Sequence, residues 1–228
     1  AVTMTINPEP VVSGSLDATL CSDIATGLTL NTNGSSVAAA TYNITSSTVA
    51  GALVAGGGNA AVPAFGVASN YLAADVFTNT TNGALLVTYT VVPVSATGCV
   101  GNARVITMTI NPEPVISSLL NSTVCSDAAT GLTLNTNGTS VIAASYNVTA
   151  VAIDPGLVVA GTNVAVPANG VAANYLSSDK FINNGAAPLT VNYTVVGISA
   201  AGCLGDPQVI VVTINPEPVT SNTLNLTQ

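Results

Sequence analysis

The chain has 228 residues, of which 48% are hydrophobic, 4% aromatic and 5% charged, and its formal net charge is −8. One Arg and one Lys cannot neutralise a run of phosphates, which excludes nucleic-acid binding and electrostatic binding to anionic lipid. Because there is no His, a Ser–His or Cys–His dyad cannot form, and we expect neither enzyme activity nor a cofactor.

One block of sequence recurs at a constant spacing of 104 residues, for example from Asn7 to Asn111. The run at 27–34 returns unchanged at 131–138, and an Asn-Pro-Glu-Pro block occurs three times. Its copies are Asn7, Pro8, Glu9 and Pro10; Asn111, Pro112, Glu113 and Pro114; and Asn215, Pro216, Glu217 and Pro218. A repeat of this kind decides the architecture before any local pattern is considered.

The Asn-Pro-Glu-Pro blocks mark the predicted domain boundaries. We expect residues 7–110 and 111–214 to form two tandem β-sandwich repeats. Residues 1–6 are predicted to be the last strand of a preceding repeat, and 215–228 a linker with the first strand of a following one. Since each linker has only four residues, two of them prolines, the array is expected to be semi-rigid.

Segments rich in β-branched residues predict strands in the first repeat at 27–31, 40–45, 87–92 and 103–110. A glycine-bearing turn at 95–102 joins the last two into a hairpin. The Gly- and Ala-rich stretch 50–70 differs most between the copies, which indicates loops or an edge strand, and no helix is predicted. The expected fold class is therefore all-β, with tandem immunoglobulin-like sandwiches joined by short Pro-rich linkers.

The cysteines form two copies of one pair, Cys21 with Cys99 and Cys125 with Cys203 in repeat order. Without His or a Cys-x-x-Cys motif a zinc site is not expected, and paired cysteines in a β-rich repeat indicate disulfides and an oxidising compartment. Bridges 21–99 and 125–203 keep each bond within one repeat and are favoured. A 99–125 bridge, which would join neighbouring repeats across the linker, remains open.

The order of these elements resembles a known family. The Asn-Pro-Glu-Pro opening, a Cys-Ser element, a Tyr-Thr-Val-Val strand, a Gly-Cys turn and a final strand ending in Asn-Pro are similar to the PKD-like, immunoglobulin-type repeats of large Bacteroidetes surface and gliding adhesins. The resemblance implies a seven-stranded or similar sandwich, a secreted multi-repeat protein, no catalytic residues and a 21–99 bridge. Tyr42 and Tyr146 stand where such repeats usually place a Trp.

Few residues are candidates for binding. Asp23 with Asp127 and Asp75 with Asp179 recur at matching positions, but calcium takes six to eight oxygens, so capping of turns or a surface position is the expected role. The glutamates of the linker blocks are expected to be solvated, with a weak interdomain ion site or a hydrogen bond as the alternative. Tyr71 and Tyr175 are the candidates for ligand contact, although packing is favoured for both.

These patterns predict a structural segment of a long protein on a bacterial cell surface. It would act as a semi-rigid stalk or filament for adhesion or surface motility, with neighbouring repeats of the same chain as its first partners. One alternative is a self-assembling fibre or sheath, because few charges and unpaired terminal strands favour association between copies. Another is a module that binds surface glycans or proteins. No insertion into a membrane is expected, since no apolar run reaches about 18 residues.

Overall fold

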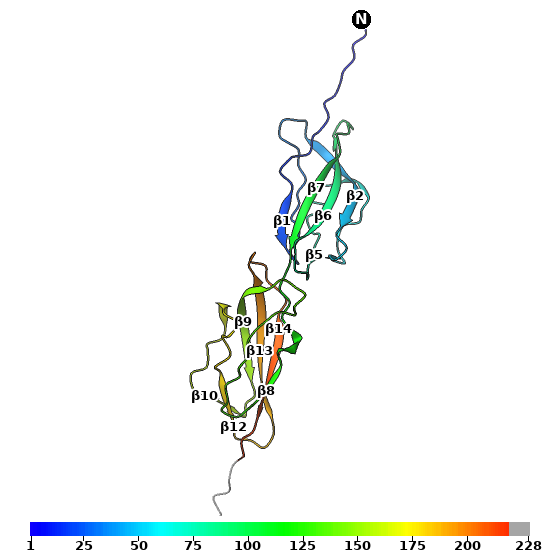
Figure 1. The fold of residues 1–228 in the computed structure, drawn as a ribbon. Helices are drawn as coiled ribbons and strands as arrows, with labels where there is room; N and C mark the ends of the chain where they lie inside the picture. Colours follow the sequence, from blue (N-terminus) through cyan, green and yellow to red (C-terminus); the bar gives the residue numbers. More distant parts are fainter. Residues whose placement is uncertain (219–228) are drawn as a thin grey trace, which may run out of the picture. The chain divides into compact units, whose positions relative to one another are not determined.

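The computed structural model describes residues 1–218, and its contacts divide the chain into two compact units (Figure 1). The first unit is Ala1–Glu113 together with two short segments from later in the chain, Thr139–Val141 and Ala201–Cys203. The second contains Pro114–Gly138, Ile142–Ala200 and the chain from Leu204 onward. The division at 113 and 114 falls inside the second Asn-Pro-Glu-Pro block.

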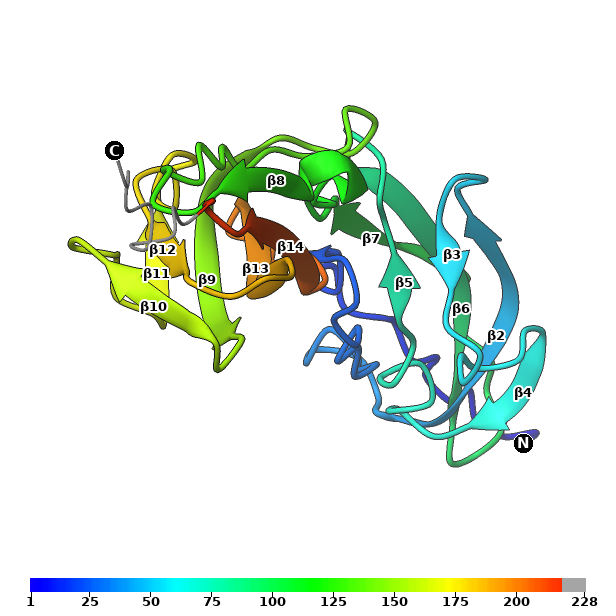
Figure 2. The ribbon, with the colours of Figure 1, turned by 90° about the horizontal axis from the view of Figure 1, so that it is seen from below.

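The first unit is a β-sandwich. Its strands are β1 (Ala18–Cys21), β2 (Ala39–Val49), β3 (Val54–Ala55), β4 (Ala64–Val67), β5 (Phe77–Thr78), β6 (Leu85–Ser95) and β7 (Arg104–Asn111). A five-stranded sheet has the order β1-β7-β6-β2-β4, and β3 pairs with β5 in a second, two-stranded sheet. All pairs are antiparallel except β1 with β7, which is parallel. Figure 2 shows β3 and β5 of the small sheet side by side.

The second unit repeats this plan. It contains a 3₁₀ turn, Ser118–Leu120, and the strands β8 (Ser122–Cys125), β9 (Ala143–Ile153), β10 (Leu157–Ala160), β11 (Ala168–Val171), β12 (Lys180–Asn183), β13 (Leu189–Ser199) and β14 (Gln208–Asn215). The large sheet has the order β11-β9-β13-β14-β8, with β10 and β12 in the small one. The predicted all-β sandwich class is confirmed.

The predicted hairpin is the centre of each sheet. Along β6, Val87, Tyr89 and Val91 are buried while the residues between them are half-buried, and β7 buries Ile106 and Met108 in the same alternation. Successive side chains of a strand point to opposite faces, so this period of two turns one face of the hairpin into the core. The hydrophobic core of the first unit contains these residues together with others from strands and loops: Leu28, Leu30, Tyr42, Ile44, Leu72 and Phe77.

The strand predicted at 27–31 is wrong. Leu28 and Leu30 are buried as the alternation indicated, but the segment forms no ladder, and the nearest pairing is an isolated bridge between Val12 and Thr32. Its amides bond to a loop instead, with Gly27 N donating to Ala73 O at 2.9 Å. Gly27 has φ +60°, a left-handed conformation that a continuous strand cannot contain.

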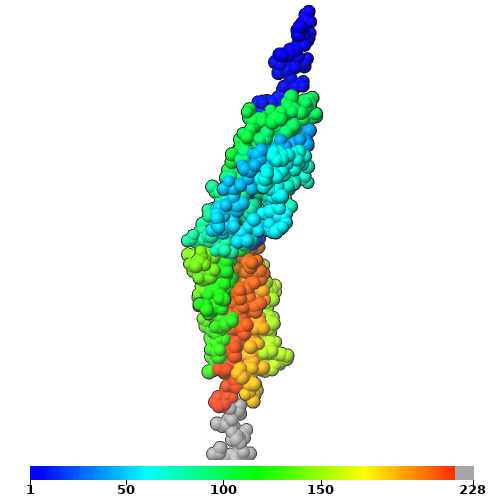
Figure 3. Space-filling view, turned by 90° about the vertical axis from the view of Figure 1, so that its right-hand side faces the viewer, coloured from blue at the N-terminus to red at the C-terminus, as the bar shows by residue number. Residues whose placement is uncertain are grey.

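The stretch 50–70, cyan in Figure 3, lies on the surface of the first unit and contains only β3 and β4. Because β4 is the edge of the large sheet, the prediction of loops and an edge strand is confirmed. Residues 1–6 are exposed and form no strand, so their assignment to a preceding repeat stays a prediction. The strand predicted within 215–228 falls mainly on 219–228, which lie outside the described residues.

A close approach recurs where the linker block meets the turn of the hairpin in each unit. A Cβ atom on Gly101 would lie 1.9 Å from the backbone oxygen of Pro10, and one on Gly205 would lie 1.9 Å from that of Pro114. Backbone cannot move aside as a flexible side chain can. These two glycines therefore let the linker pack against the hairpin.

We predict that Gly101→Ala destabilises the first unit by at least about 1–3 kcal/mol, the usual cost of overpacking. The matched control is Gly83→Ala, because a Cβ on Gly83 meets nothing within 4 Å. Urea unfolding of both variants checks this. Equal midpoints for the two would contradict the close approach.

Candidate functional site

Parallel pairing places the two cysteines of each repeat at opposite ends of its sheet. Cys21 ends β1 opposite Asn111, the last residue of β7, whereas Cys99 lies in the turn before β7 begins at Arg104. A strand rises about 3.3 Å per residue, so the length of β7, roughly 23 Å, separates the two positions. A disulfide needs Cα atoms within about 7 Å.

The predicted bridges 21–99 and 125–203 are therefore wrong. Cys21 is bonded to Cys203, at a sequence separation of 182, and Cys99 and Cys125 are free thiols, so the alternative 99–125 bridge is absent from the described chain as well. Cys203 is fully buried and belongs to the first unit, because Ala201–Cys203 clusters with it. Another late segment of that unit, Thr139–Val141, is tied by Val141 N, which donates to Thr81 O at 3.0 Å.

The linker blocks differ in exposure. In the first block Glu9 is exposed and accepts a hydrogen bond from Asn102 Nδ2 at 3.1 Å, and Glu217 of the third block is exposed too. Glu113 of the second is only 2% exposed, so the expectation of a solvated charge is wrong there. Its amide donates to Asn79 O at 2.9 Å, which holds the residue against a fully buried loop position.

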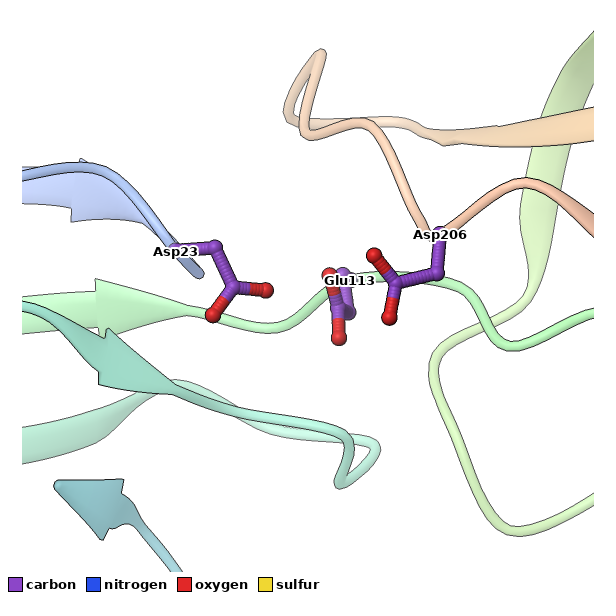
Figure 4. A group of neighbouring side chains, drawn as sticks. All are labelled: Asp23, Glu113 and Asp206. Carbon is purple, nitrogen blue, oxygen red and sulfur yellow. The ribbon is translucent and has the colours of Figure 1, made fainter. Parts of the chain in front are cut away.

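Two carboxylates of the first unit come together near the end of β7. Oxygens of Asp23 and Glu113 lie within 4.8 Å of one another (Figure 4). The third residue drawn there, Asp206, belongs to the segment before β14 of the second unit. Asp23 also performs the predicted turn role: it adopts φ +61°, and Thr78 Oγ1 donates to its carboxylate. Two carboxylates supply fewer oxygens than calcium takes, and they support no metal assignment.

Asp75 and Asp179 are both buried, so a surface position, one of the two roles expected of them, is wrong. Asp75 is 2% exposed, and its carboxylate accepts hydrogen bonds from Tyr89 Oη at 2.6 Å and from Ala60 N at 2.7 Å. In the second unit Asp179 accepts from Tyr193 Oη at 2.7 Å and Val164 N at 2.9 Å. Each aspartate thus ties a loop to the central strand of the sandwich.

Burial raises the pKa of the Tyr89 phenol far above its ordinary value of about 10, and the hydrogen bond to Asp75 and that group's charge raise it further. The same causes raise the pKa of Tyr193 beside Asp179. Tyr89 and Tyr193 are only 2% and 1% exposed, which fits a structural role. The tyrosine–aspartate hydrogen bond was not predicted from the sequence, because the two residues are 14 positions apart in the chain. The one available signal is that both the tyrosine and the aspartate recur at the repeat spacing.

A cavity of about 390 Å³ opens over the Tyr193–Asp179 pair in the second unit. Val151, Val159, Val166 and Phe181 are among its apolar walls. The first unit has a smaller one of about 160 Å³ over Tyr89 and Asp75. Both oxygens of the buried carboxylate already accept hydrogen bonds within the protein, so the polar floor of each cavity is internally satisfied.

Tyr71 and Tyr175 do not line these cavities. Each packs against the core of its unit, and each hydroxyl donates to a backbone oxygen, Tyr71 to Ala61 at 2.9 Å and Tyr175 to Ala165 at 2.8 Å. Packing, the favoured role, is what these contacts show. Contact with a ligand stays a prediction. Tyr42 and Tyr146, at the expected Trp position, are 4% and 5% exposed on β2 and β9.

A family model described as a PKD-like domain matches residues 64–114 and 122–218, which is more than half of the chain. The chain belongs to the PKD-like domain family. No curated protein matches these PKD-like repeats significantly. In the part of the chain that the structure describes, no helix has the length and apolarity needed to cross a membrane.

Solved structures that match the PKD-like chain include cadherin fragments. Drosophila N-cadherin EC1-4 is 14% identical over 93% of this chain and 50% of its own, with a TM-score of 0.28. Human CDH23 EC21-23 is 13% identical over 92% and 69%, also at 0.28. The chain thus spans half the length of the N-cadherin fragment, and at these scores the likeness carries no argument about function.

We predict that Tyr89→Phe costs about 1–3 kcal/mol, because it leaves a buried carboxylate oxygen without its donor. Tyr71→Phe removes a hydroxyl from a half-buried residue and should cost less than about 1 kcal/mol. Urea denaturation followed by circular dichroism compares the two. Equal losses would show that the Asp75 contact is energetically ordinary.

The raised pKa values of Tyr89 and Tyr193 also predict alkaline unfolding. A phenol whose pKa is higher in the folded than in the unfolded state stabilises the fold fully below pH about 10, and this contribution is lost as the pH rises further. Absorbance at the tyrosinate band and circular dichroism, recorded together, measure the two events. We expect these phenols to ionise only as the sheet unfolds, and ionisation of all six tyrosines in a native fold would contradict it.

Proposed function

We propose that this chain is a structural segment of a long extracellular protein on a bacterial cell surface, in which PKD-like repeats form a semi-rigid stalk or filament for adhesion or surface motility. The observation that carries the proposal is the Cys21–Cys203 bond. It closes a sequence separation of 182 residues within a chain of 228. The all-β repeats and the absence of His support a mechanical rather than a catalytic role.

The bond changes the path that a pulling force takes. Tension applied to the two ends passes along the chain to Cys21, through the sulfur atoms, and on from Cys203. Residues between the two cysteines, which include β2 to β13, then cannot be extended even when their sheets unfold. A stalk that holds a cell against flow benefits because it keeps its length under load.

The composition suits an exposed position. With 5% charged residues the surface carries few charges, so its interactions depend little on salt or pH. A disulfide persists in an oxidising compartment. The expected partners are neighbouring repeats of the same chain, other copies in a filament, and surface glycans or proteins.

Single-molecule pulling from the two ends tests this role. The oxidised chain should release only its terminal segments, whereas the reduced chain should release about 600 Å more, at roughly 3.3–3.6 Å per residue over the 182-residue separation. A variant with Cys21→Ser and Cys203→Ser should match the reduced chain in oxidising buffer. Full extension of the oxidised wild type would contradict the proposal.

A further inference from the structure

The repeat relates each free thiol to a bonded one. Cys125 stands one period of 104 residues after Cys21, and Cys99 stands one period before Cys203. The chain therefore carries one bonded pair, Cys21 with Cys203. It also carries an unbonded counterpart of each member, since Cys125 corresponds to Cys21 and Cys99 corresponds to Cys203.

The backbone around the Cys21 and Cys125 positions is the same. Cys125 ends β8 opposite Asn215, as Cys21 ends β1 opposite Asn111. The next residue in each case donates to that asparagine carbonyl, Ser126 N at 2.9 Å and Ser22 N at 3.0 Å. Cys125 thus presents its sulfur from the backbone setting in which Cys21 is bonded.

The turns that hold Cys99 and Cys203 also agree. Each is preceded by a glycine in the left-handed region, Gly98 at φ +79° and Gly202 at φ +82°. In each, the second glycine of the turn donates to the preceding strand at 2.9 Å, Gly101 N to Pro93 O and Gly205 N to Gly197 O. Cys99 is half-buried and Cys125 is exposed, so both are open to reaction.

We propose that Cys125 of one copy forms a disulfide with Cys99 of a second copy, repeating the Cys21–Cys203 bond and joining chains covalently. The partner is a second molecule of this chain. The inference rests on the sequence period and the observed bond, and it stands whether or not the protein serves as a stalk.

The hydrogen bond from Val141 N to Thr81 O can also be repeated. One period away, Val37 of one copy and Gly185 of the other take these places. Both atoms of the bond belong to the backbone, so the change from Thr81 to Gly185 removes neither. This backbone contact therefore does not depend on the side chains that differ between the repeats at these two positions.

The reaction needs a disulfide oxidant, such as oxidised glutathione. The Cys125 thiolate attacks one glutathione sulfur, the glutathione S–S bond breaks, and one reduced glutathione leaves. The Cys99 thiolate of the second copy then attacks the mixed disulfide and releases the other. Two thiols lose two protons and two electrons, and one oxidised glutathione becomes two reduced molecules.

The experiment uses the full chain with its Cys21–Cys203 bond intact, in a glutathione redox buffer. Wild-type protein should give a reducible ladder of dimers and larger species on a denaturing gel. Cys99→Ser alone and Cys125→Ser alone should stay monomeric. An equimolar mixture of these two variants should give a dimer and nothing larger, because each contributes one half of the pair.

Isotopic labelling of one variant separates specific from random pairing. The dimer from the mixture should contain one labelled and one unlabelled chain and yield a Cys99–Cys125 peptide, in excess of the statistical share for random thiols. The proposal is overturned if the mixture stays monomeric, or if either variant dimerises with itself as readily. It is also overturned if wild-type Cys99 and Cys125 pair only within one chain while the mixture does not react.

Discussion

The parallel pairing of β1 with β7 is the constraint on which the covalent chemistry of this protein depends. It places Cys21 beside Asn111, a full strand length from Cys99 in the hairpin turn. A bridge inside one repeat, which was favoured because it keeps each bond within one domain, is thereby impossible, and the sulfur of Cys21 bonds to Cys203 instead. The same pairing of β8 with β14 leaves Cys125 beside Asn215, so one rule of strand order accounts for both the bonded and the free cysteines.

Inside each sandwich the buried carboxylates are stabilised by a small number of hydrogen bonds to uncharged groups. Asp75 and Asp179 are buried, yet each carboxylate receives a tyrosine hydroxyl and a backbone amide, which avoids the penalty of an unpaired buried group. A salt bridge between Arg104 and Asp17, at 3.5 Å, lies at the surface of the first unit. Exposed ion pairs contribute about 0–1 kcal/mol to the free energy of unfolding. The stability of the fold therefore depends mainly on the apolar core and the tyrosine–aspartate contacts.

What could be predicted from the sequence was local or periodic. The β6–β7 hairpin was found because alternating side chains and a glycine turn are adjacent in the chain, and the two repeats because their residues recur. The site could not be predicted as well. Pairing of β1 with β7 joins residues about ninety positions apart, Tyr89 and Asp75 meet through a loop, and segment 27–31 keeps a strand-like alternation while bonding to a loop. In each case tertiary partners, which single-sequence patterns do not encode, decide the outcome.

Non-reducing peptide mapping of protein secreted into an oxidising compartment tests the central claim most directly. The strand order predicts that Cys21 is recovered in a peptide joined to Cys203, with Cys99 absent from it. A peptide joining Cys21 to Cys99 would contradict the account, because the parallel β1–β7 pairing could not then be present. That result would also contradict two proposals that rest on the Cys21–Cys203 bond. These are the transmission of tension through the disulfide and the joining of copies through Cys99 and Cys125.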